Sequence, residues 1–85
     1  MHIKVTGLFA RSYKRLPLDI ERTAEKQERI FRENPFDTSL KTHKLHGKYK
    51  DYWAFSVNTS YRILFTFEDK RIAVFIDIGT HSIYT

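Results

Sequence analysis

Three features in the second half of the sequence carry side chains that act on phosphodiesters: a basic tract, an arginine and a histidine. The tract contains one acid, Asp51, and a series of basic side chains: Lys41, His43, Lys44, His46, Lys48 and Lys50. Lysines in a flexible loop hold backbone charge, while a guanidinium on a rigid strand, here Arg62, meets one phosphate through two hydrogen bonds. The pattern favours a phosphodiester ligand.

His81 follows Gly79 and Thr80, immediately past the end of a predicted strand, beside a glycine that removes side-chain bulk. In an antiparallel meander this point lies near the start of the middle strand, so we expect Arg62 and His81 to be neighbours. Cleavage of RNA needs a base for the 2′-hydroxyl proton, a cation for the phosphorane charge and an acid for the leaving 5′-oxygen. Two alternatives remain open: His81 as a surface histidine near a frayed terminus, and Arg62 as a solvated or ion-paired strand residue.

His43 and His46 are three positions apart and are therefore a candidate metal pair. The sequence has no cysteine, and no carboxylate at a fitting spacing completes a site. We expect no metal and no other cofactor, and we assign a base or phosphate-binding role to His43. The alternative interpretation of the lysines is a solvated surface.

Composition sets the class of protein. The 85 residues make one domain, 1–85, and aromatic residues at 15% supply the large side chains that so small a core needs. Without cysteine there is no disulfide, and the sequence lacks a run of about 20 apolar residues that could span a bilayer. We therefore expect a soluble, cytoplasmic protein. A net charge of +5 is compatible with a polyanion, an anionic membrane or an acidic protein partner.

The N-terminal half predicts a short strand and a helical hairpin. Residues 2–5 alternate polar and apolar side chains, as a short edge strand does. A short helix then begins at Leu8, and Pro17 separates it from a second helix over residues 18–33. The apolar stripe of that second helix is interrupted by a polar side chain and consists of Ile20, Ala24, Gln27, Ile30 and Phe31. We expect the sheet to hold this helix in place.

The C-terminal half predicts three strands, at residues 52–57, 60–67 and 71–78, separated by short polar turns. The fold class is therefore α+β, with a short N-terminal strand, a helical hairpin and a three-stranded antiparallel meander. Alternation places Arg62 on one face with Leu64 and Thr66, and Tyr61, Ile63, Phe65 and Phe67 on the other. We expect the helices to cover the second of these faces and the first to remain free for a ligand.

This order of elements, with the segments HKLHG, YWAFSV, SYRILF and VFIDIGTH, resembles the RelE/ParE superfamily of toxins from type II toxin-antitoxin systems. The resemblance covers almost the whole chain and is most specific to the YafQ-like branch, which has a His-x-Leu-x-Gly segment and a terminal Gly-Thr-His. It implies an RNase-A-like fold, and an mRNA interferase that cleaves mRNA in the ribosomal A site and blocks translation. It also implies a cognate antitoxin that wraps the toxin, with no small-molecule substrate.

By position, the resemblance implies four catalytic residues. His81 is the general acid or base, Arg62 the cation for the phosphate and transition state, His43 a second base or orienting group, and Tyr84 a stacking or hydroxyl-orienting aromatic. The RNA-binding residues are Lys41, Lys44, His46, Lys48 and Lys50. Ser56 and Ser60 stand where YafQ-like toxins have another histidine and an aspartate, and the sequence stops without the C-terminal helix of some relatives. A ParE-type gyrase inhibitor and a catalytically silent antitoxin-binding domain are the alternatives.

Overall fold

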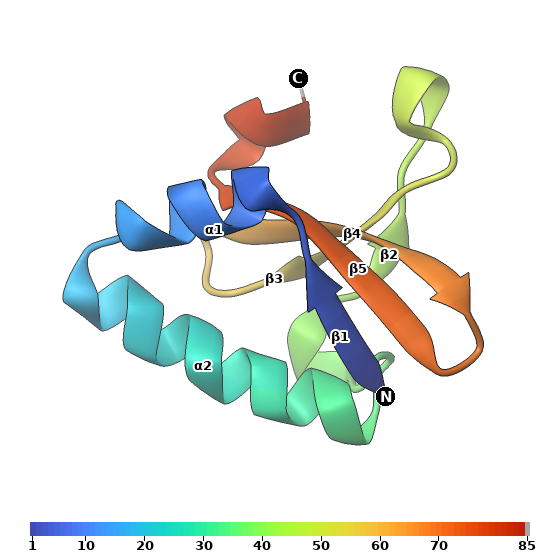
Figure 1. Cartoon of the computed structure of the whole chain (residues 1–85), viewed down its shortest axis with the longest axis horizontal. Helices are drawn as coiled ribbons and strands as arrows, with labels where there is room; N and C mark the ends of the chain where they lie inside the picture. The colour runs from blue at the N-terminus through green and yellow to red at the C-terminus, as the bar shows by residue number, and fades with distance from the viewer. Residues whose placement is uncertain (85) are drawn as a thin grey trace.

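The computed structural model describes residues 1–84 and contains the predicted helical hairpin. After β1 (His2–Val5), the chain forms α1 (Gly7–Lys14) and α2 (Leu18–Glu33) (Figure 1). Thr6 caps α1, because its hydroxyl accepts a hydrogen bond from the Phe9 amide at 3.0 Å. The same hydroxyl donates to the Ile76 carbonyl at 2.7 Å, which fixes the start of α1 against the sheet. None of the helices within residues 1–84 has the length and apolar character needed to cross a membrane.

Within the described residues, the sheet has five strands rather than the four predicted. β3 (Trp53–Ser56), β4 (Arg62–Asp69) and β5 (Ile72–Gly79) form the expected antiparallel meander, with ends shifted by one or two residues. β2 (His43–Lys44) pairs antiparallel with β3 at one edge, and β1 pairs parallel with β5 at the other, in the order β1-β5-β4-β3-β2. The prediction of a loop for the whole basic tract was wrong, because a two-residue strand is too short to show alternation.

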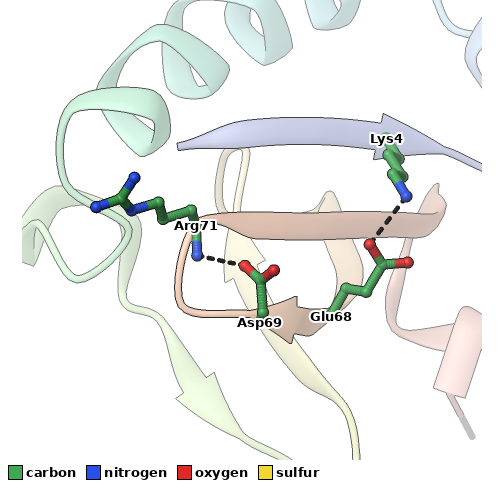
Figure 2. A network of polar contacts seen from close by, with 4 residues as sticks. All are labelled: Lys4, Glu68, Asp69 and Arg71. Carbon is green, nitrogen blue, oxygen red and sulfur yellow. Dashed lines mark hydrogen bonds and ion pairs between the residues drawn. The ribbon is translucent and has the colours of Figure 1, made fainter.

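β1 also contacts β4 through side chains that pass over β5. The Lys4 ammonium lies 2.9 Å from a Glu68 carboxylate oxygen, with both side chains about half exposed (Figure 2). Asp69 accepts a hydrogen bond of 2.7 Å from the Arg71 amide and thereby orders the turn between β4 and β5. An exposed ion pair of this kind contributes about 1 kcal/mol or less, so backbone pairing with β5 is the main attachment of β1.

The two faces of the sheet are covered differently. We call the face under α1 and α2 the helix-covered face; its fully buried aromatic side chains are Phe31 from α2 and Phe55, Phe65 and Phe75 from the strands. The other, the site face, has a smaller apolar cluster of Leu45, Ala54 and Leu64. Tyr61, Ile63, Phe65 and Phe67 belong to the core of the helix-covered face, so the predicted alternation along β4 is confirmed.

The polar interruption in the stripe of α2 has a structural explanation. Gln27 is buried, and its side-chain Nε2 donates a hydrogen bond of 3.0 Å to the Ser56 carbonyl at the end of β3. A buried carbonyl without a partner would cost about 1–3 kcal/mol, so this glutamine satisfies the last residue of β3 while joining α2 to the sheet.

Candidate active site

Arg62 is the first residue of β4, and its guanidinium is fixed by the preceding loop. Nη1 donates to the Asn58 carbonyl at 2.9 Å and lies 3.4 Å from the Thr59 carbonyl. Asn58 shapes this loop through its side chain, whose Oδ1 accepts from the amides of Ser60 at 2.9 Å and Tyr61 at 2.8 Å. The loop therefore holds the cation in a defined position at the edge of the site face.

The expected neighbour of Arg62 is present, because Arg62 pairs with Gly79 across β4 and β5 and His81 follows two residues later. Arg62 Nη2 lies 3.2 Å from His81 Nε2. The glycine is required at this point, since a Cβ on Gly79 would come within 2.6 Å of a methyl carbon of Ile83. The close approach lets the last segment, η3 (His81–Tyr84), fold back over the end of β5.

His81 is exposed but is not part of a frayed end. Ile83 and Tyr84 pack against the apolar cluster of the site face, and the Tyr84 hydroxyl lies 3.2 Å from His81 Nδ1. Because a guanidinium has no acceptor, His81 Nε2 must accept the Arg62 hydrogen bond, and Nδ1 then carries the proton of a neutral imidazole. His81 Nδ1 therefore donates to the Tyr84 oxygen, and the two neighbours together define the tautomer.

His43 lies apart from this group. It stands opposite Ala54, which stands opposite Leu64, so His43 is on the site face but two strand spacings, about 10 Å, from β4. Its Nδ1 is 2.9 Å from the Lys41 carbonyl and must donate to it, because a carbonyl only accepts. In the neutral imidazole with this Nδ1–H donor, Nε2 is the nitrogen that carries the lone pair, and it can accept a hydrogen bond from a ligand.

The basic tract forms an exposed surface beside the site face. It follows the 3₁₀ turn η1 (Thr38–Leu40) and contains β2 and a second 3₁₀ turn, η2 (Gly47–Tyr49). The part after β2 stands with η3 on the side of the sheet away from α2 (Figure 1). Its basic residues are all exposed: Lys41, His43, Lys44, His46, Lys48 and Lys50. Among the described residues, none of these lysines forms an ion pair, since the two pairs present are Lys4–Glu68 and Arg32–Glu28. Their charge is therefore available to an anion.

The site face is not as open as predicted, since η3 and the cluster of Leu45, Ala54 and Leu64 cover part of it. The turn of η3 back over the end of β5 produces no periodic pattern of apolar residues in the sequence. Gly79 was the one residue that indicated a close approach at this point. The contact between Arg62 and the Asn58 carbonyl was not predicted either. The available signal was the asparagine itself, because an asparagine in a turn commonly accepts hydrogen bonds from backbone amides two residues on and so shapes the loop.

No cluster of three or more His, Asp or Glu side chains within residues 1–84 is arranged to hold a metal ion. Tyr13, whose pKa is raised to about 12 by burial and by Glu25, Glu21 and Glu28, lies on α1 and takes no part in the site.

Over residues 1–84, the sequence matches the family described as a bacterial toxin of type II toxin-antitoxin system, YafQ. The chain belongs to the YafQ family. No curated protein matches it in sequence. As a type II toxin it has a cognate protein antitoxin, and its function is that of an mRNA interferase; gyrase inhibition is not favoured.

Solved structures with the same fold include YafQ from E. coli strain BL21(DE3), with a TM-score of 0.76 and 19% identity over 98% of this chain and 97% of that one. A YoeB/ParE toxin from Agrobacterium tumefaciens has a TM-score of 0.79 and 18% identity over 95% and 99% of the two chains. An E. coli DinJ-YafQ complex has a TM-score of 0.68 and 18% identity over 96% and 94%. These likenesses show that the α+β fold is shared over 95–98% of the chain.

Proposed function

We propose that this YafQ-family toxin cleaves mRNA bound to the ribosome, with His81 and Arg62 as the central catalytic pair. The observation that carries the proposal is the hydrogen bond between Arg62 Nη2 and His81 Nε2, which joins a fixed cation to an exposed imidazole. A phosphodiester oxygen is a stronger acceptor for a guanidinium than a neutral imidazole is. Bound RNA would draw Arg62 onto the phosphate and release His81 Nε2 for proton transfer.

The remaining side chains have supporting roles. Tyr84 holds the Nδ1 proton of His81, so that Nε2 is the nitrogen facing the reacting phosphate. His43 is a second base or a substrate-orienting group on the same face, through its available Nε2. The basic tract residues Lys41, Lys44, His46, Lys48 and Lys50 contact the mRNA or rRNA backbone. Arg62 stabilises the charge that develops on the phosphorane.

Dependence on the ribosome is consistent with the sparse set of proton-transfer groups. Each such group contributes a factor of about 10² to 10⁴, and accurate positioning of the reacting bond adds much of the remaining rate. Ser56 and Ser60 supply none of the histidine or carboxylate chemistry that YafQ-like toxins have at these positions. A ribosome that presents the mRNA in a fixed conformation would compensate for that difference.

The antitoxin is expected to bind the same basic surface. A YafQ toxin from E. coli forms a complex with DinJ, and here the site face combines Arg62 with exposed lysines. An acidic antitoxin segment over residues 41–50 and Arg62 would neutralise this charge, and its affinity should therefore fall as salt rises. Affinity that is unchanged between low and high salt would contradict electrostatic recognition through the tract.

The test is a cell-free translation reaction containing the purified protein, with mRNA ends mapped by primer extension. Cleavage within codons of translated mRNA, and its absence when ribosomes are withheld, is the expected result. A gyrase supercoiling assay on the same preparation is the control for the ParE-type activity. If ribosome-bound mRNA stays intact, the proposal fails, and the gyrase assay then separates an inhibitor from a catalytically silent domain.

A further inference from the structure

A hollow of about 280 Å³ with a mixed polar and apolar lining adjoins Arg62 at the end of the sheet. Its wall combines α2, the turn after η1, the end of β3 and the loop before β4. Arg62 belongs both to this wall and to the catalytic pair, since Nη1 contacts the Asn58 carbonyl while Nη2 contacts His81. A molecule in the hollow is thus directly beside the place of a reacting phosphate. The volume is near the lower end for small-ligand sites, about 300 Å³, and suits a single nucleotide.

Two amide side chains in the wall could read a nucleobase. Asn58 uses its Oδ1 for the loop amides, and its NH₂ group has no partner within residues 1–84. Gln27 is only 8% exposed and uses its Nε2 for the Ser56 carbonyl, while its Oε1 has no partner in the same part of the chain. The wall therefore offers one donor and one acceptor. Exposed base edges present complementary donors and acceptors, which is how single-stranded RNA is read by proteins.

Lys41 adds a cation to the wall of the hollow, and its backbone has an unfavourable conformation there. It has φ 53° and ψ 39°, the left-handed conformation, where it ends η1 and turns the chain into β2. A residue with a Cβ loses roughly 1–2 kcal/mol there, and glycine or asparagine adopts the conformation more readily. A lysine at this position is consistent with a functional use of its ammonium group, since strained residues cluster at binding sites.

We propose that the hollow is a nucleotide subsite, which holds the nucleotide next to the scissile phosphate. Lys41 contacts the phosphate oxygens of that nucleotide, and its base lies between the Asn58 NH₂ group and Gln27 Oε1. The inference rests on the proposed function for the identity of the substrate as RNA. It adds a place where the toxin itself distinguishes one base from another, independently of contacts made by the ribosome.

The experiment titrates the isolated full-length toxin with each of the four nucleoside 3′-monophosphates, and separately with inorganic phosphate and an oligoglutamate peptide, by ¹⁵N-resolved NMR. The expected result is a shift of the Asn58 and Gln27 side-chain amides by nucleotides, with affinities that differ among the four bases and exceed that of phosphate. Unshifted side-chain amides would overturn the subsite. Equal binding of phosphate, or shifts caused by oligoglutamate and not by nucleotides, would do the same.

Two variants sharpen the result. Lys41→Asn keeps a residue that tolerates the left-handed conformation but removes the charge, so nucleotide affinity should fall about fivefold, the effect of one exposed charge pair, while stability is unchanged or raised. Lys70→Asn, in the turn after β4, is the matched control and should leave the affinity unchanged. Equal affinities for the wild type and Lys41→Asn would remove Lys41 from the site and overturn the proposed phosphate contact.

Asn58→Asp keeps the oxygen that accepts from the Ser60 and Tyr61 amides but removes the NH₂ donors. The order of affinities among the four nucleotides should therefore change, and an unchanged order would overturn base reading by this residue. Cleavage takes no part in these measurements. If nucleotides bind in the hollow but ribosomal mRNA stays intact, the proposed function fails; if mRNA is cleaved but the hollow stays empty, the subsite fails.

Discussion

The helix-covered face and the site face of the same sheet use their side chains for different purposes. On the first, Phe31 packs its ring against Phe55, Phe65 and Phe75 at centroid distances of 4.9, 5.0 and 5.2 Å. On the second, Arg62, His81 and Tyr84 are linked by hydrogen bonds at half-exposed or exposed positions. Burial thus stabilises one face, whereas the other keeps polar groups accessible. Mutations on the two faces should separate stability from activity.

The largest effect is expected for Phe31→Ala on the helix-covered face. Phe31 is fully buried, and removing its ring should lower the free energy of unfolding by about 3–5 kcal/mol, because the cavity lies among three other rings. Chemical denaturation monitored by circular dichroism measures this change. The matched control is Phe36→Ala, since Phe36 is 54% exposed. Equal losses for the two variants would contradict the central position of Phe31.

On the site face, His81→Ala should reduce cleavage of ribosome-bound mRNA by about 10² or more and leave the unfolding free energy and antitoxin binding near those of the wild type. Arg62→Ala should cause a similar loss through the transition-state charge. The double variant should lose less than the sum, because both groups serve one step. Single-turnover cleavage kinetics measure all three, and a wild-type rate for His81→Ala would refute the acid-base assignment.

A smaller effect is expected when Lys44, Lys48 and Lys50 are changed together to Ala. Each is exposed, so folding should change by less than about 0.5 kcal/mol per residue, while ribosome association should weaken about tenfold through lost phosphate contacts. Ribosome co-sedimentation at several salt concentrations measures the affinity and its salt dependence. Unchanged association combined with a large loss of thermal stability would assign these lysines to the structure instead.

The smallest effect is expected for Tyr84→Phe. The ring and its packing remain, but the oxygen that accepts a hydrogen bond from His81 Nδ1 is lost. The value of kcat should therefore fall about three- to tenfold with KM unchanged, the size of one hydrogen bond. Tyr49→Phe is the control, because Tyr49 packs against the same apolar cluster and its hydroxyl has no hydrogen bond within residues 1–84. A full rate for Tyr84→Phe would show that Arg62 alone suffices to orient His81.

Periodic features of the sequence predicted most of the fold. Pro17 and Asn34 marked the limits of α2, and alternation from Tyr61 to Phe67 gave the correct faces of β4. The proximity of Arg62 to His81 was also predicted from the sequence, since a meander brings the start of one strand beside the end of the next. These features depend on local pattern or on the shortest connection between strands, which is why sequence is sufficient for them.

Features that depend on non-local contacts could not be predicted in this way. The parallel pairing of β1 with β5 depends on residues far apart in the sequence, and β2 consists of a histidine and a lysine with no apolar side chain to indicate a strand. The hollow beside Arg62 combines Gln27 from a helix with Lys41 and Asn58 from two separate loops. In the sequence, Gln27 is only a polar interruption of an apolar stripe, because its hydrogen bond to the Ser56 carbonyl at the end of β3 is a non-local contact.

The parallel pairing of β1 has a consequence for how the protein is made. His2 pairs with Ile72, so the first strand stays without its partner until about seventy further residues have been synthesised, roughly 4–14 s at ordinary rates of translation. Arg62 and His81 belong to the same late part of the chain. The sheet and the proposed catalytic pair are therefore assembled together at the end of synthesis. Under the proposed function, a nascent chain thus lacks the pair that would cleave the mRNA from which it is being translated.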